Sequence, residues 1–449
     1  MSRSVKVAVI GAGVSGLVAA RELTRERHNV VVFEKNTRLG GTWLYTPETD
    51  SDPLSLDPNR NKVHSSLYPS LRTNLPRQLM EFLDYPFCRD IERVDPRTFP
   101  SHEEVLRFLQ EFGDEFGINE LTRFETEVVK VERVEDEGGW VVESRASHGG
   151  GVSVSREVFD AVVVCSGHNV APRVAEVCGI EKWRGFQMHS HNYRVPQPFQ
   201  GQVVILIGYG PTSFDISREI GLVAKEVHVS VRLNPARKGM KFQDFGNVRF
   251  HPVIKCINED CLVVFEDGVT INADSIIHCT GYKNELPFLE TDGVVTVDEN
   301  RVGPLYKHVF PPTLAPCLSF IGLTELESVF PVAELQGKWV ARVLSGKMVL
   351  PSEEEMMKSI EEHYQFMQQN GLPKRFTHYL GPSYSQLDYK QWLAKHLGLP
   401  PLEDWRDAMF THIIKNFVEM NGGFRDQWDD DYWDAIINNT KLLHSSNQS

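Results

Sequence analysis

The clearest fold signal in the sequence is VKVAVIGAGVSGLVAARELTRERHNVVVFEK, from Val5 to Lys35. It opens with a short apolar run, Val5 to Ile10, that is typical of a buried parallel strand. A GxGxxG turn follows, then a helical segment and a second apolar strand that ends in Glu34. This order of strand, glycine turn, helix, strand and acid predicts a Rossmann-like unit that binds an adenine dinucleotide.

Each position of the turn has a physical reason. Gly11 permits a tight turn, Gly13 lets the backbone approach a pyrophosphate, and Gly16 lets the helix pack on the strand. The helix N-terminus offers unpaired N–H groups and a positive dipole end, and Glu34 accepts hydrogen bonds from a ribose hydroxyl. The expected contacts with this first dinucleotide are Gly11, Ala12, Gly13, Val14, Ser15, Gly16, Glu34 and Lys35.

A second stretch, QVVILIGYGPTSFDISREIGLVAKEVHVSVR, repeats this order from Gln202 to Arg232. Its second strand, expected over Val227 to Val231, ends in Arg232 where the first unit has an acid. A carboxylate repels a 2′-phosphate and a guanidinium binds it, so we expect NADPH here rather than NADH. A basic cluster follows at Arg237, Lys238 and Lys241, although a solvated loop is the preferred interpretation of the two lysines. The expected contacts are Gly208, Tyr209, Gly210, Pro211, Thr212, Ser213 and Arg232.

Two such units in one chain suggest FAD together with NADPH. Apolar runs ending in CSGH (Cys165 to His168) and CTGY (Cys279 to Tyr282) predict further strand ends, where the backbone passes close to a cofactor or crosses between domains. The predicted fold class is α/β, with two dinucleotide-binding, Rossmann-like domains, and with helices on both faces of parallel sheets. The expected FAD-binding domain comprises 1–195, with a junction strap at 183–193, and 281–449, which ends in a helical segment. The NADPH-binding domain is expected at 196–280, inserted in the FAD domain.

Bulk composition excludes several function classes. The chain has 449 residues and a net charge of −14, which argues against nucleic-acid or anionic-membrane binding. No apolar window approaches the length of a membrane span, and the N-terminus enters a strand at once without a signal-peptide pattern. The cysteine count of seven is odd and the spacing scattered, which fits a reducing compartment, so we expect a cytoplasmic protein. Cys256 and Cys261 are interpreted as structural or free thiols on a β-hairpin.

The segment WRGFQMHSHNY, from Trp183 to Tyr193, fits no simple periodicity. Its two histidines, His189 and His191, are not joined by an acid or cysteine at ligand spacing, so no metal site is expected.

With these motifs assembled, the chain resembles the flavin-containing monooxygenases, in particular their plant sulfur-oxygenating branch. Gly185, His189 and Tyr193 match the family fingerprint F-x-G-x-x-x-H-x-x-x-Y, with Trp183 in place of Phe. GAGVSG, GGTW, RTNLPRQLMEFLDYPF, CSGH, CTGY and FPVAELQGKW resemble further family blocks, and the C-terminal block THYLGPSYSQLDYKQWLAKHLGLPPLEDWR resembles the plant branch. The resemblance implies that Trp183 to Tyr193 links the two domains and that His189 has a structural and hinge-like role without proton transfer in the chemical step.

The resemblance also implies the reaction. NADPH reduces FAD, O2 adds to form a C4a-hydroperoxyflavin, and a soft nucleophile takes one oxygen atom. We expect the nucleophile to be the sulfur of a thioether, and an amine nitrogen is the alternative. Asn74 is the implied catalytic residue, because an amide can donate to one cofactor and accept from another without adding charge; a turn asparagine is the structural alternative. Gln336 is implied near the start of the last helix, where the dipole would stabilise reduced flavin; a surface glutamine is the alternative. The further implied cofactor contacts are Gly41, Thr42, Trp43, Thr73, Leu75 and Val128.

Other readings remain open at this point. A Baeyer–Villiger-type monooxygenase would carry Trp where Tyr193 stands and Asp after Gly281. A disulfide reductase would need a C-x4-C motif beside Gly40 to Tyr45, which has no cysteine. An NADPH oxidase and a flavin-binding regulatory protein are the remaining alternatives; NADPH oxidation in air separates the regulator from the enzymes. The substrate and the oligomeric state are not readable from the sequence.

Overall fold

The structure, a computed structural model, describes residues 3–87, 95–134, 138–148, 151–169, 171–232, 242–326, 328–383 and 386–446. It divides into two compact units, each assembled from three separate stretches of chain. The first unit comprises Met1–Leu44, Leu75–His168 and Asn284–Asp407. The second comprises Tyr45–Asn74, Asn169–Lys283 and Ala408–Ser449.

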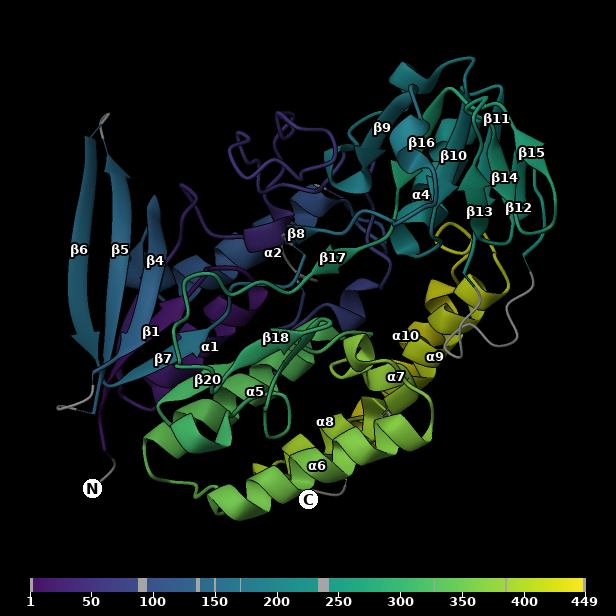
Figure 1. The fold of residues 1–449 in the computed structure, drawn as a ribbon. Coiled ribbons are helices and arrows are strands. Elements are labelled where there is room, and N and C mark those ends of the chain that lie inside the picture. Colours follow the sequence, from purple (N-terminus) through teal and green to yellow (C-terminus); the bar gives the residue numbers. More distant parts are fainter. Residues whose placement is uncertain are drawn as a thin grey trace. The chain divides into compact units, whose positions relative to one another are not determined.

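A five-stranded parallel sheet forms the centre of the first unit (Figure 1). Its strands lie in the order β20 (Leu318–Phe320), β7 (Ala161–Val164), β1 (Lys6–Ile10), β2 (Asn29–Phe33) and β3 (Thr122–Arg123). Every residue of β7 is buried, which fits a central strand covered on both faces. The sheet therefore matches the strands expected from the apolar runs.

The two faces of this sheet carry different layers. Val7 and Val9 of β1 pack with α1 (Val14–Arg25), α2 (His102–Glu115) and α5 (Val329–Leu344), and α1 and α5 lie side by side (Figure 1). Ala8 and Ile10 point the other way, because successive strand residues alternate.

An antiparallel sheet covers this opposite face. It consists of β4 (Thr126–Arg133), β5 (Trp140–His148) and β6 (Gly151–Phe159), and it supplies Trp140 and Phe159 to the core. The expectation of helices on both faces is therefore wrong for this unit, since a sheet replaces one helical layer.

A second five-stranded parallel sheet lies in the second unit. Its order is β12 (Val248–His251), β11 (Glu226–Ser230), β10 (Val203–Ile207), β16 (Ser275–His278) and β9 (Phe186–His189). The helix α4 (Pro211–Gly221) packs against β11 and β12. On another face, Ile205 and Ile207 pack with Phe265 of the small antiparallel sheet β13 (Ile254–Ile257), β14 (Val263–Phe265) and β15 (Thr270–Ile271). Both units thus share one plan, a parallel sheet in which a helix follows one strand directly, α1 after β1 and α4 after β10.

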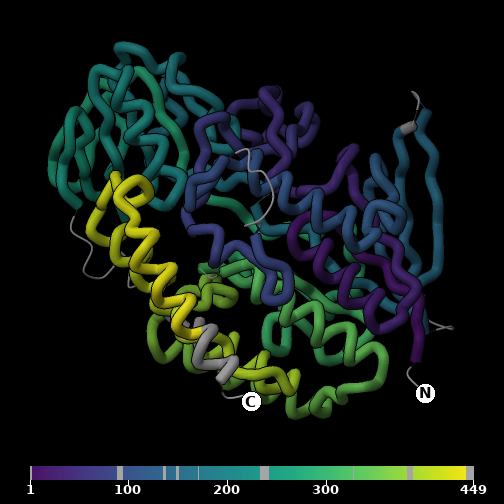
Figure 2. Tube along the Cα trace, turned by 180° about the vertical axis from the view of Figure 1, so that it is seen from behind, coloured from purple at the N-terminus to yellow at the C-terminus, as the bar shows by residue number. Residues whose placement is uncertain are grey.

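Shorter elements complete the described chain. Two-stranded sheets pair β8 (Ala171–Pro172) with β17 (Tyr282–Lys283) and β18 (Thr296–Asp298) with β19 (Arg301–Gly303). The remaining helices are α3 (Ile118–Leu121), α6 (Glu353–Gln369), α7 (Leu380–Ser383), α8 (Gln386–His396), α9 (Asp404–Val418) and α10 (Asp430–Ser446). The last two run side by side (Figure 2), and His412 of α9 lies 5.8 Å, ring to ring, from Trp433 of α10. Within the described ranges, no helix is long and apolar enough to cross a membrane.

The compact units differ from the expected domain boundaries. Residues 169–195 pack with the second parallel sheet, where β9 pairs with β16 along Ser275–His278. The segments 45–74 and 408–449 also join this second unit. The second unit lies between parts of the first unit in the sequence, which agrees with the expected fold class. It also contains segments from before and after the expected inserted domain.

Candidate functional site

The first glycine turn is shaped by a close approach of two backbones. Gly11 has φ of 100°, and a Cβ added there would lie 2.6 Å from the carbonyl oxygen of Cys165, just past β7. A Cβ on Gly16 would overlap the carbonyl oxygen of Gly11. Both positions therefore require glycine, and the turn keeps the form expected for binding a pyrophosphate. We call this turn, Gly11 to Gly16, the first cradle and the turn from Gly208 to Ser213 the second cradle.

A second glycine pair lines the same cradle. The N–H of Gly40 donates to the carbonyl oxygen of Ala12 at 3.0 Å. A Cβ on Gly41 would lie only 2.7 Å from the Cα of Gly13. The GGTW block, which includes the short helix η1 (Gly41–Trp43), thus lies directly against the turn. This position is the one expected for a block that contacts the cofactor, and the contact itself stays a prediction.

Glu34 is buried at the end of β2 and ties the cradle together. Its Oε2 accepts a hydrogen bond from the N–H of Ala12 at 2.8 Å. Its Oε1 accepts from the backbone N–H of Asn36 at 2.9 Å and from the Asn36 side chain at 2.8 Å. A carboxylate offers about four lone-pair directions, so one remains for a ribose hydroxyl.

The N-terminus of α1 is electrostatically suited to an anion. No side chain caps it, and its first turn contains no acid. The first N–H groups of a helix lack intrahelical partners and sit at the positive end of its dipole. The residues present therefore fit a dinucleotide pyrophosphate, as FAD would place there.

The second cradle repeats this geometry within its own unit. Gly208 has φ of 97°, and a Cβ added there would lie 2.6 Å from the carbonyl oxygen of Cys279. The helix α4 begins at Pro211, with no side-chain cap and no acid in its first turn. Ser213, in the place of the third glycine, is fully buried, so its small side chain fits the close packing. Tyr209 packs edge-on against Phe250, with ring centroids 5.2 Å apart.

The register of β11 changes the expected place of Arg232. The N–H of Gly11 donates to the carbonyl oxygen of Phe33, and the N–H of Gly208 donates to that of Ser230. The position equivalent to Glu34 is therefore Val231, which is buried, and Arg232 follows as an exposed residue. The second cradle has no carboxylate at the ribose position and a cation one residue later. Arg237, Lys238 and Lys241 lie outside the described residues.

Asn74 is held by a residue that the sequence interpretation did not single out. The Nη2 of Arg425 donates to the Oδ1 of Asn74 at 2.5 Å, and its Nε donates to the carbonyl oxygen of Thr73 at 2.9 Å. Arg425 also pairs with Asp215 on α4, with Nη1 and Oδ1 2.8 Å apart. All four residues belong to the second unit. No local pattern signals this contact, because 351 residues separate Arg425 from Asn74.

The other implied contacts are distributed over the first unit. Val128 lies on β4 beside an irregularity in its pairing with β5, and its side chain is buried. Leu75 and Trp43 are partly buried against the main core, while Lys35 and Thr42 are exposed. Their cofactor roles stay predictions.

Gln336 lies elsewhere than expected. It is fully buried in the interior of α5, and helices α6 to α10 follow, so it is neither at a helix start nor on the last helix. Its Oε1 accepts from the N–H of Gly322 at 3.0 Å, and its Nε2 donates to the hydroxyl of Tyr389 at 3.0 Å. The alternative of a surface glutamine is wrong for the same reason. The two hydrogen bonds of this amide join α5 to the backbone at Gly322 and to Tyr389 of α8.

The segment Trp183 to Tyr193 is explained by packing inside the second unit. The Nδ1 of His189 accepts from the N–H of His191 at 3.0 Å, so the proton sits on Nε2, which faces the carbonyl oxygen of Gly281 at 3.1 Å. Burial lowers the pKa of His189 to about 3. The hydroxyl of Tyr193 donates to Glu219 of α4 at 2.6 Å. Tyr193 thus links the segment after β9 to α4, which begins at the second glycine turn. His189 is neutral and has a structural role.

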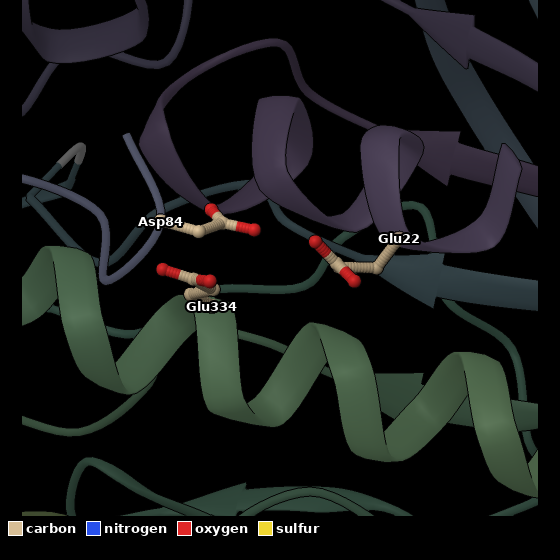
Figure 3. A group of neighbouring side chains, drawn as sticks. All are labelled: Glu22, Asp84 and Glu334. Atoms are coloured by element: carbon tan, nitrogen blue, oxygen red, sulfur yellow. The ribbon is translucent and has the colours of Figure 1, made fainter. Parts of the chain in front are cut away.

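Three carboxylates converge elsewhere, in the first unit. Glu22 of α1, Glu334 of α5 and Asp84 face one another (Figure 3). The guanidinium of Arg21 lies 2.8 Å from Glu22 and 2.7 Å from Asp84, and Lys338 pairs with Glu334. Because buried cations already neutralise these acids, the cluster is an ion-pair network rather than a metal site.

A family model, a related protein and two solved structures each match most of this chain. A family model described as "Flavin-binding monooxygenase-like" matches residues 4–236 and 243–395. Flavin-containing monooxygenase FMO GS-OX-like 2 of Arabidopsis thaliana is 54% identical over 433 residues, covering 95% of this chain and 92% of that protein. The structure of S-allyl-L-cysteine S-oxygenase from Allium sativum aligns with a TM-score of 0.92 at 50% identity, covering 98% and 99% of the two chains. Tmm from Pelagibacter sp. strain HTCC7211 aligns with a TM-score of 0.75 at 25% identity, covering 91% and 90%.

Proposed function

The chain belongs to the flavin-binding monooxygenase-like family, and from that premise we propose an NADPH- and FAD-dependent S-oxygenase. The enzyme is a flavin-containing monooxygenase. The proposed reaction converts a thioether, NADPH, a proton and O2 into a sulfoxide, NADP+ and water. One oxygen atom of O2 goes to sulfur and the other leaves as water, while NADPH supplies the two electrons.

The observation that carries the proposal is the pair of cradles with different strand ends. The first ends in the buried carboxylate of Glu34, which suits the free ribose of FAD. The second has Val231 at that position and Arg232 next to it. Loss of the carboxylate removes repulsion, and a guanidinium binds a phosphate through two parallel hydrogen bonds, which together favour NADPH.

Each group in the chain then has a binding or orienting task. FAD, when bound and reduced by NADPH, supplies the oxygen-activating chemistry. The N-termini of α1 and α4 bind the two pyrophosphates through unpaired N–H groups. Asn74 provides a neutral hydrogen-bond donor to the reacting groups. A neutral donor orients a ligand without attracting the water that a charged group would hold.

We propose sulfur as the atom that is oxygenated because a similar protein is named as an S-oxygenase. The protein from Allium sativum is named an S-allyl-L-cysteine S-oxygenase, and it is 50% identical over nearly the whole chain. We therefore propose a small thioether as substrate and O2 as co-substrate. We also propose the reducing cytoplasm as the compartment, as expected from the odd number and scattered spacing of the seven cysteines.

A stopped-flow experiment tests the proposal. The protein, loaded with FAD, is reduced by NADPH without oxygen and then mixed with aerated buffer. We expect an absorbing species that differs from both oxidised and reduced flavin and that decays faster when a thioether such as S-allyl-L-cysteine is added, with formation of sulfoxide. Immediate reoxidation with one peroxide per NADPH, with or without thioether, would indicate an NADPH oxidase. Absence of reduction by NADPH would leave only a flavin-binding protein.

A further inference from the structure

We propose that Arg425 is a positioning residue, which holds the side-chain amide of Asn74 with its nitrogen free to donate to the bound reactants. This inference rests on the proposed function, because Asn74 touches reacting groups only if that function is correct. It adds a residue from the far end of the chain to the machinery of oxygen transfer.

Four hydrogen bonds join the guanidinium of Arg425, which has five N–H donors, to three acceptor residues. Nη2 lies 2.5 Å from Oδ1 of Asn74, and Nε lies 2.9 Å from the carbonyl oxygen of Thr73. Nη1 and Nη2 lie 2.8 Å and 3.0 Å from the two carboxylate oxygens of Asp215. The side chains of Arg425 and Asp215 are only 11% and 18% exposed, so water competes weakly for these bonds.

This contact decides which way the amide of Asn74 points. A guanidinium has donors and no acceptor, so only the oxygen of an amide can face it. The nitrogen of Asn74 must then point away from Arg425. Among the residues that the structure describes, this nitrogen has no hydrogen-bond partner. The amide is thereby presented as a donor, whereas a free amide would rotate and offer its oxygen equally well.

Asp215 makes the arrangement rigid. Its carboxylate grips the guanidinium with two bonds, which fixes the plane of the guanidinium as well as its position. The hydroxyl of Tyr68 donates to the same carboxylate at 3.3 Å. Asp215 itself lies on α4, the helix that begins at the second cradle, so the donor of Asn74 is set by a chain of three side chains anchored on that helix.

The neighbouring ion pair, which is more exposed than that of Arg425 with Asp215, provides a control on the same two segments. Arg72 and Asp426 lie 2.6 Å apart and join the same two segments, 68–74 and 424–427, without touching the Asn74 amide. If docking of the C-terminal segment were all that mattered, Asp426→Ala would reproduce the effect of Arg425→Met. If the orientation of the amide matters, only Arg425→Met should change catalysis.

The experiment uses the full-length protein loaded with FAD, in the variants Arg425→Met, Arg425→Lys, Asn74→Ala, Asp426→Ala and the double variant Arg425→Met/Asn74→Ala. Hydrogen–deuterium exchange of peptides covering 68–75 reports the contact without any turnover. Peroxide formed per NADPH consumed, with a thioether present, reports the coupling of oxygen transfer.

We expect faster exchange in 68–75 for Arg425→Met but not for Asp426→Ala. Peroxide per NADPH should rise about tenfold in Arg425→Met and in Asn74→Ala, because a hydrogen bond to a charged group is lost in one and the donor in the other. The double variant should leak no more than Asn74→Ala, since residues acting through one group are not additive. Arg425→Lys, which keeps one charged donor, should recover part of the coupling.

Three results would overturn the inference: unchanged exchange in Arg425→Met, equal peroxide release in Asp426→Ala, or additive leakage in the double variant. A wild-type protein that NADPH does not reduce would reject the proposed function and, with it, the catalytic purpose of the contact. In that case the exchange data would still show whether Arg425 fixes the segment, so the two failures are distinct.

Discussion

The buried carboxylate of Glu34 accepts a hydrogen bond from the backbone N–H of Ala12 at 2.8 Å, which joins the end of β2 to the turn before α1. The equivalent position in the second unit is Val231, which has no side-chain acceptor for this purpose. The carboxylate of Glu34 therefore ties the first turn to β2, and the second turn is not tied in this way. This is the difference expected if the first turn holds the proposed FAD tightly and the second exchanges the proposed NADPH.

Glu34→Ala should yield protein that loses flavin. The substitution removes the acceptor for Ala12 and both bonds to Asn36. Loss of charge-assisted hydrogen bonds of this kind costs about 1.5–3 kcal/mol, or about a tenfold to hundredfold weaker binding. The flavin-to-protein absorbance ratio after dialysis measures it. The exposed Glu354 is the control: Glu354→Ala should retain flavin fully, and equal retention in both variants would contradict the role of Glu34.

Gly11→Ala should both unfold more easily and lose flavin. Alanine at φ of 100° is strained by about 1 kcal/mol, and its Cβ would press on the carbonyl oxygen of Cys165, so the total cost is about 3 kcal/mol. Gly346→Ala separates the two effects, because Gly346 has φ of 75° with no atom within 4 Å of an added Cβ. Its thermal midpoint should fall by only about 2–4 °C, with flavin retained. Similar losses for both variants would reject steric contact as the cause.

Arg232→Ala should weaken NADPH binding about tenfold to hundredfold and leave NADH nearly unchanged. Its guanidinium can bind the 2′-phosphate, which NADH lacks. The dissociation constants, measured by coenzyme titration of the oxidised protein, give the ratio. Lys225, exposed at the opposite end of β11, offers a charge-matched control, and Lys225→Ala should alter neither constant. If both coenzymes weaken alike in Arg232→Ala, the assignment of the 2′-phosphate fails.

Asn74→Asp should keep flavin yet uncouple NADPH oxidation from oxygen transfer. A carboxylate can still accept from Arg425, but it has no hydrogen to donate to the reactants. Peroxide released per NADPH should rise about tenfold, as in Asn74→Ala. Coupling as tight as in the wild-type protein would show that Asn74 does not act as a donor.

Acid should destabilise the protein through its buried neutral histidines. Burial lowers the pKa of His189 to about 3 and that of His278 to about 4, so their contribution to folding is complete above the unfolded pKa, about 6.5. As the pH falls below 6.5, the unfolded state binds protons that the folded state does not, and His189 costs about 1.4 kcal/mol per pH unit down to about pH 3. His189→Asn should flatten the decline of the thermal midpoint between pH 6.5 and 4.5. An equally steep decline in the wild-type protein and in His189→Asn would contradict this contribution of His189.

The dinucleotide units could be predicted from the sequence because their signals are local. A strand, a glycine turn and a helix are adjacent in the chain, and Gly11 and Gly208 are required by the backbone at a single point. The apolar run from Val5 to Ile10 then predicts β1 to within one residue of its observed bounds. The antiparallel sheet β4 to β6 was missed as a covering layer, because an apolar face does not specify whether a helix or a sheet packs on it.

The sequence alone thus predicted two dinucleotide-binding units, their order and the resemblance to the family. The fold added three facts: Val231 rather than Arg232 stands where Glu34 does, Gln336 is buried within α5, and Arg425 contacts the side chain of Asn74. The two groups of features differ in how far apart in the sequence the interacting residues lie. Backbone conformation at a turn depends on neighbours in the chain, whereas the orientation of an amide depends on whichever donor the folded chain brings to it, here one that lies 351 residues away.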